Sequence, residues 1–192
     1  MSGLFRIVAY GILCLPMMFV WTASYELIRN SGTAFPLFVV LYIADIFICA
    51  LIHELGHAIA ANLCGWRIKY IAVFPFAYYL APRKLKLWHG RSGDIGGAVS
   101  IDSAPIKSAN RVALFSLAGP LANFMFAGVL LAVVGAVSIP TIQNVVAGFA
   151  IVSLLLGLGN ILPWRTRQGL RSDGMVLLSV VRGAVSSSPA RT

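Results

Sequence analysis

The chain has 192 residues, of which 59% are hydrophobic and only 11% are charged, and its formal net charge is +9 at pH 7. Soluble globular domains carry about 25% charged residues, so this composition excludes an ordinary soluble domain and indicates an integral membrane protein. The excess of Lys and Arg does not indicate nucleic acid binding, because these residues gather in the segments that follow apolar stretches, as topology signals do.

Four segments reach the length of about 20 apolar residues that a transmembrane helix needs. They are approximately Ile7–Ile28, Phe35–Cys64, Val112–Val137 and Ile142–Leu162. The sequence therefore predicts an all-α polytopic membrane protein with about four transmembrane helices.

The second apolar segment contains the pattern His53-Glu54-Leu55-Gly56-His57. Two His residues four positions apart lie on one face of a helix and can bind one metal ion, and the Glu beside them can accept a proton from water at that metal. Ionisable groups inside a membrane span are costly and are usually functional. The pattern predicts His53 and His57 as metal ligands and Glu54 as a general base, within or beside the bilayer.

The distribution of positive charge predicts the topology. Basic residues are concentrated between the second and third spans and after the fourth: Arg67, Lys69, Arg83, Lys84, Lys86, Arg91, Lys107 and Arg111, then Arg165, Arg167, Arg171, Arg182 and Arg191. By the positive-inside rule, both termini, the middle loop and the opening of the active site face the cytoplasm.

The middle loop, Gly65–Asn110, mixes aromatic, glycine, proline and basic residues. Gly65 is well placed to cap the preceding helix. Arg67–Tyr70 alternates polar and apolar residues, and Gly96–Ile101 follows a glycine turn, so both segments are typical of strands. We expect a small membrane-associated β hairpin or sheet; the alternative is a disordered basic loop.

The last two spans carry further polar residues. The third contains Ala118-Gly-Pro-Leu-Ala-Asn123, in which Asn123 needs a buried partner and can serve either function or helix–helix contact. The fourth ends at Asn160-Ile-Leu-Pro163, and a short apolar segment follows that either Ser172 or Asp173 can cap.

A catalytic zinc site usually has three protein ligands, so one more is needed. Asp45 lies two helical turns before His53 and is out of reach, and Glu26 falls at the opposite end of its span. Asp173 follows a broken helix that can fold back toward a buried metal. The candidates are His89, Asp45, Asp94, Asp102, Asp173 and Glu26, and the residues alone leave the loop candidates open beside Asp173.

These motifs, in this order, resemble the site-2 protease family of intramembrane zinc metalloproteases. The resemblance implies that Asp173 is the third zinc ligand with His53 and His57, and that Asn160 holds the substrate or the developing oxyanion. The length predicts a single domain over residues 1–192, with the first span and loop in 1–34, a core like that of the family in 35–185 and a polar tail in 186–192. The segment Arg165–Arg171 departs from the family pattern, in which the Asn and Asp elements are closer.

The resemblance predicts a protease with one Zn²⁺ per chain that hydrolyses peptide bonds of transmembrane or membrane-proximal substrates. Its partners would be a membrane protein or peptide substrate and the lipid bilayer, without nucleic acid. The alternative is a proteolytically inactive metal-binding scaffold or immunity-type partner of the same fold. A metal transporter fits less well, because the spans other than the second contain almost no ionisable groups.

Overall fold

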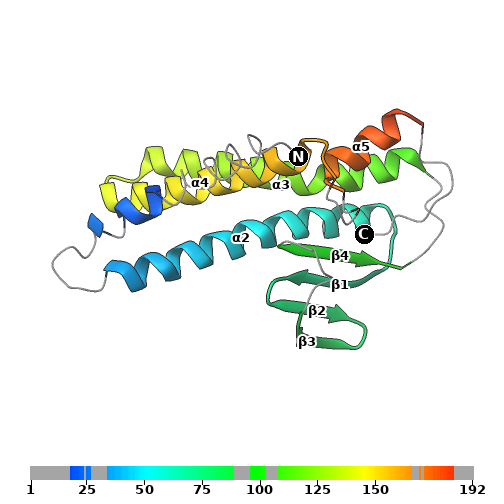
Figure 1. The fold of residues 1–192 in the computed structure, drawn as a ribbon, viewed down its shortest axis with the longest axis horizontal. Coiled ribbons are helices and arrows are strands. Elements are labelled where there is room, and N and C mark those ends of the chain that lie inside the picture. Colours follow the sequence, from blue (N-terminus) through cyan, green and yellow to red (C-terminus); the bar gives the residue numbers. More distant parts are fainter. Residues whose placement is uncertain are drawn as a thin grey trace. The chain divides into compact units, whose positions relative to one another are not determined.

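The protein is described here by a computed structural model that covers residues 18–23, 25–26, 34–88, 96–102, 108–165, 169 and 171–183. Figure 1 shows the helices and the small sheet of the described residues. The helices are α2 (Ala34–Leu63), α3 (Ala109–Ala136), α4 (Pro140–Ile161) and the short α5 (Asp173–Val181). The strands are β1 (Ile68–Val73), β2 (Phe76–Leu80), β3 (Arg83–Leu87) and β4 (Gly97–Ile101).

Three helices in the described part of the chain are long and apolar enough to cross a membrane. They cover Pro36–Leu63, Ala109–Ala136 and Pro140–Ile161, close to the last three predicted spans. Of the first predicted span, the structure describes only residues 18–23 and 25–26, which are helical. The count of four spans therefore stays a prediction, whereas a mostly helical fold with three candidate spans is established.

The helix that carries the His-Glu-x-x-His pattern ends as the sequence predicts. Gly65 has a φ of 70°, a left-handed conformation that glycine adopts without steric cost. The amide of Gly65 donates to the carbonyl of Asn62 at 2.9 Å, and the amide of Trp66 donates to that of Ala61 at 2.8 Å. This pair of bonds is a Schellman cap, which ends α2 and turns the chain toward the sheet.

The middle loop forms a four-stranded antiparallel sheet in the order β3-β2-β1-β4. The predicted strands at Arg67–Tyr70 and Gly96–Ile101 correspond to β1 and β4, which pair directly. Strand β3 was not predicted, because Arg83–Leu87 consists of five exposed residues, three of them basic and two of them leucines. The alternative of a disordered basic loop is wrong for the four strands.

The chain divides into two compact units, which are described separately. One unit contains Met1–Cys49 with Phe124–Leu156; in it, the rings of Trp21 and Phe38 meet edge to face at 5.0 Å. The other contains Ala50–Asn123 with the segment from Gly157 onward, and it holds all three residues of the predicted metal site.

Close packing of α2 on α3 shapes the second unit. A Cβ added to Gly56 would collide with the carbonyl of Ala118 and would lie 2.8 Å from the Cβ of Ala122. Small residues at a helix–helix contact let the two backbones approach, as is common in membranes. The Gly56 in the middle of the metal-binding pattern therefore brings α3 against the two histidines.

Candidate metal centre

The two histidines of α2 are buried and face each other. His53 and His57 are one helical turn apart, and their Nε2 atoms lie 3.1 Å from each other. Glu54, between them in sequence, is buried as well. The spacing of four residues on one helix therefore produces the paired imidazoles that the sequence predicts.

Helix α3 fixes the orientation of both rings through their other nitrogen. The Nδ1 of His53 lies 2.7 Å from Oδ1 of Asn123, and the Nδ1 of His57 lies 2.7 Å from the carbonyl oxygen of Phe115. Both oxygens can only accept, so each Nδ1 carries the proton. A neutral imidazole has one N–H, and each Nε2 is therefore left with an unprotonated lone pair, as a metal ligand requires.

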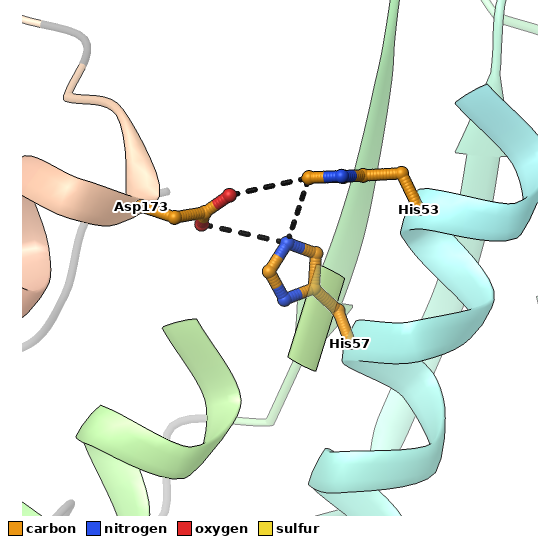
Figure 2. A group of neighbouring side chains, drawn as sticks. All are labelled: His53, His57 and Asp173. Carbon is orange, nitrogen blue, oxygen red and sulfur yellow. Dashed lines mark hydrogen bonds and ion pairs between the residues drawn. The ribbon is translucent and has the colours of Figure 1, made fainter. Parts of the chain in front are cut away.

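Asp173 completes the group from α5. Its Oδ2 lies 3.2 Å from Nε2 of His53, and its Oδ1 lies 3.4 Å from Nε2 of His57. Figure 2 shows the carboxylate pointing at the two rings from the opposite side. His53, His57 and Asp173 are the one group of at least three potential metal ligands found among the described residues.

The donor set fits a zinc ion. Tetrahedral zinc with bonds of about 2.1 Å holds its ligand atoms roughly 3.4 Å apart, and the three separations here are 3.1, 3.2 and 3.4 Å. An ionised carboxylate and two imidazole lone pairs converge, an arrangement that a cation stabilises.

Comparison with known families agrees with this geometry. A model of peptidase family M50 matches residues 41–148, more than half of the chain. The chain belongs to peptidase family M50. This is the site-2 protease family that the motifs resemble, so that prediction is confirmed. None of the curated proteins compared with the chain matches it. The M50 match includes His53, Glu54 and His57 but ends before Asn160 and Asp173.

Two glycines form part of the wall of the M50 site. A Cβ on Gly119 of α3 would lie 2.7 Å from Nε2 of His53 and would also collide with His57. A Cβ on Gly97 of β4 would lie 2.6 Å from both Cγ and Oε1 of Glu54. The backbones of α3 and β4 therefore lie directly against the two histidines and Glu54, and a side chain at either position would enter the site.

Hydrogen bonds between the two ends of the segment Arg165–Arg171 bring the chain back to the histidines, although this segment departs from the expected pattern. Arg165 and Arg171 pair as an isolated antiparallel bridge, and the amide of Ser172 donates to the carbonyl of Trp164 at 3.1 Å. The Ser172 hydroxyl also donates to the carbonyl of Leu162 at 2.6 Å and accepts from the amide of Trp164 at 3.0 Å. Arg165 and Arg171 are therefore held side by side, and Asp173 begins α5 beside the end of α4.

Ser172, and not Asp173, caps α5. The Ser172 hydroxyl accepts from the amide of Met175 at 3.1 Å, whereas the Asp173 carboxylate points to the histidines. Gly174 follows, and a Cβ there would collide with the carbonyl of Ile161, so α5 starts directly against the last turn of α4. The capping residue and the predicted metal ligand, which the sequence could not distinguish, are adjacent residues with different partners.

Two of the other candidate ligands have partners elsewhere. Asp102 forms an ion pair with Lys69, with 2.9 Å between Oδ1 and Nζ. Asp45 is fully buried, and its Oδ1 accepts from the thiol of Cys49 at 3.2 Å, within the other compact unit. Neither carboxylate belongs to the group that the structure assembles around His53 and His57.

The remaining candidates are placed only in part. Glu26 is exposed, and His89 and Asp94 lie outside the described residues. Asn160 is half-buried in the last turn of α4, and its role toward a substrate stays a prediction. The sequence left the role of Asn123 open between function and helix–helix contact. A polar amide in an apolar span indicated that it needed a partner, and that partner is the Nδ1 of His53.

Because Ser172 and Asp173 have different partners, we expect substitution of Ser172 to lower stability and substitution of Asp173 to lower zinc affinity. Asp173→Asn keeps the Ser172 cap, so we expect thermal stability of the zinc-free protein to be unchanged and zinc affinity to fall. Ser172→Ala removes a cap, which costs roughly 0.5–2 kcal/mol, while the ligand atoms remain. Thermal unfolding and zinc titration of the purified variants measure both effects. Undiminished zinc affinity in Asp173→Asn would exclude Asp173 as a ligand.

Proposed function

We propose that this M50 protein is an intramembrane zinc metalloprotease that cleaves transmembrane or membrane-proximal segments. The observation that carries the proposal is the convergence of two Nε2 lone pairs and a carboxylate in the buried interior of the second unit, with Glu54 adjacent. His53, His57 and Asp173 would hold one zinc ion, and the M50 family is zinc-dependent.

Zinc, when bound, supplies a Lewis acid that polarises a peptide carbonyl and makes water acidic enough to lose a proton near neutral pH. Glu54 acts as the general base: its carboxylate accepts the proton of the attacking water and then delivers it to the leaving nitrogen. Asn123 and the Phe115 carbonyl keep the histidines in the tautomer that exposes Nε2. Asn160 is proposed to hold the substrate carbonyl or its developing oxyanion.

A helical substrate must unwind before hydrolysis, since its carbonyls are engaged in helical hydrogen bonds. Strand β4 supports a way to hold the unwound segment. It is an edge strand of the described sheet, and its Gly97 contacts Glu54. We propose that the substrate pairs with β4 as an added strand, which would present extended backbone beside the proposed base.

An inactive scaffold would be the better proposal if Asp173 lay away from the histidines. The Asp173 carboxylate lies within 3.4 Å of both histidines, which supports the protease instead. The apolar helices and the family support a bilayer environment. We further propose the single-domain organisation predicted from the sequence, with both termini and the site opening toward the cytoplasm.

The proposal is tested by measuring zinc and hydrolysis on the same preparations. Purified protein in vesicles should contain one zinc per chain and cleave a reconstituted single-span substrate. His53→Ala and His57→Ala should each lose zinc and cleavage, because each leaves two protein ligands. Elemental analysis and gel separation of the cleavage products provide the two readouts.

The histidine outside the pattern provides a matched control. His89→Ala removes an imidazole as well, and we expect it to retain zinc and cleavage. Zinc without cleavage of any single-span substrate in the wild type would favour the scaffold. Undiminished zinc in both His53→Ala and His57→Ala would place the metal elsewhere and refute the proposed site.

A further inference from the structure

Helices α2 and α4 carry a buried polar cluster that the proposed mechanism does not use. Asp45 and Cys49 lie one turn apart on α2, and Ser153 lies on α4. All three residues are fully buried. They belong to the compact unit that does not contain the predicted zinc ligands, so this cluster is distinct from the candidate metal centre.

The cluster has more hydrogen-bond acceptors than its thiol can satisfy. The Sγ of Cys49 lies 3.2 Å from Oδ1 of Asp45 and 3.7 Å from the carbonyl oxygen of Phe149. A thiol has one hydrogen, so it can donate to only one of these oxygens at a time. The second carboxylate oxygen, Oδ2 of Asp45, is buried and has no hydrogen-bond partner among the described residues. Buried acceptors without donors indicate a site where a cation can bind.

The depth of Asp45 makes an uncompensated carboxylate unfavourable. Asp45 lies nine residues after Pro36, about 14 Å into a candidate span of 28 residues that is about 42 Å long. A hydrocarbon core of about 30 Å therefore covers Asp45 wherever the core falls along this span. The described part of this unit contains no Lys, Arg or His. An ionised Asp45 thus needs a bound cation or a proton to neutralise it.

The atoms around the thiol suit a thiophilic cation. Tetrahedral zinc, with Zn–S bonds of about 2.3 Å and Zn–O bonds of about 2.0 Å, holds sulfur and oxygen roughly 3.5 Å apart. The two separations of Cys49 Sγ from oxygen, 3.2 and 3.7 Å, bracket that value. The side chain of Ser153 also hydrogen-bonds to the Cys49 thiol and brings a hydroxyl oxygen to the same sulfur. One sulfur and three oxygens from two helices are therefore available as ligands.

We propose that this cluster binds a second metal ion, a thiophilic divalent cation such as zinc. Its ligands would be Asp45, Cys49, Ser153 and the carbonyl of Phe149. The Cys49 thiol would release its proton to solvent as the ion binds, and the thiolate and the Asp45 carboxylate would cancel the two positive charges of the ion. The loaded site is then neutral, as apolar surroundings require. The sulfur ligand selects zinc or cadmium over magnesium or calcium.

This second site should bind zinc more weakly than the site at His53 and His57. Its cation must displace the thiol proton of Cys49, whereas the Nε2 lone pairs of the two imidazoles are already available. We therefore expect the purified protein to retain one zinc ion, at the histidines, and to take up the second ion when metal is added.

Cadmium absorbance tests the proposal on full-length wild-type protein. A thiolate bound to cadmium gives an ultraviolet charge-transfer band, and the group of His53, His57 and Asp173 contains no sulfur. The band therefore reports only on a cysteine site. Titration should produce a band that saturates at one thiolate-bound cadmium per chain. Added zinc should remove the band by competition, and added magnesium should leave it unchanged.

Two variants identify the ligands, and each has a matched control. Cys49→Ser should lose the band, whereas Cys64→Ser replaces another buried cysteine, whose thiol faces the Arg111 carbonyl, and should keep it. Asp45→Asn should weaken cadmium binding by more than the roughly 10–100-fold that loss of an outer-shell partner costs. Asp102→Asn removes a carboxylate of the other compact unit and should leave the affinity unchanged.

Three results would overturn the proposal. Absence of the band in the wild-type protein at saturating cadmium would show that Asp45 and Cys49 are only a hydrogen-bonded pair, and this result requires no variant to fold. A band that persists in Cys49→Ser would place the cadmium at another cysteine. Unchanged affinity in Asp45→Asn would exclude the carboxylate as a ligand. None of these readouts requires proteolysis, so failure here is distinguishable from failure of the proposed function.

Discussion

Glu54→Gln should abolish cleavage while leaving zinc bound. Glutamine has nearly the same shape but cannot accept the proton of the attacking water, and a positioned acid–base group contributes about 10²–10⁴-fold to rate. Glu54 is buried beside the histidines and against Gly97, so the substitution changes chemistry with little change in packing. Cleavage of a reconstituted single-span substrate and zinc content of the same sample measure the two expectations.

The control for this change is Glu26→Gln, which removes the only other glutamate of the chain at an exposed position. We expect it to cleave at the wild-type rate. Full activity in Glu54→Gln would refute the general-base role. Loss of zinc in that variant would instead make Glu54 a ligand, which the group of His53, His57 and Asp173 does not require.

Gly119→Ala should empty the metal site without unfolding the helix. The new Cβ would lie 2.7 Å from Nε2 of His53 and would collide with His57, so the lone pairs could no longer converge. We expect zinc affinity to fall by at least the roughly 10–100-fold typical of disturbed ligand orientation. Alanine favours helix over glycine by about 1 kcal/mol, so a weakened helix would not explain the loss.

Gly128→Ala is the matched substitution in α3, since a Cβ there meets nothing within 4 Å. This substitution raises the helix propensity of α3 by the same amount as Gly119→Ala, and it should leave zinc affinity unchanged. Competition titration with a chromogenic zinc chelator compares the two variants. Equal affinities would show that the Gly119 contact does not restrict the site.

The parts of this fold that follow local rules were predictable from sequence. Three spans follow from length and apolar composition, the end of α2 follows from Gly65, and the paired imidazoles follow from the spacing of His53 and His57. Each depends on residues within one element or one turn. The membership in M50 was recognisable because several such local patterns occur in a characteristic order.

The contacts between elements were not predictable in the same way. Asn123 and the Phe115 carbonyl reach the histidines only because Gly56 lets α3 approach α2, and a backbone carbonyl leaves no trace in the sequence. Strand β3 lacks a buried face, so its pattern of basic and leucine residues also suits a loop. The assignment of the cap to Ser172 required the positions of both side chains.

The closure at Trp164 and Ser172 makes the segment between them a permissive position for insertion. Its two ends are tied by hydrogen bonds and by the bridge of Arg165 with Arg171, so added length is accommodated beyond that tie. Doubling a flexible loop costs only about 0.6 kcal/mol in closure entropy. An epitope or a small reporter domain placed after Arg165 would therefore leave Asp173 in register with the histidines.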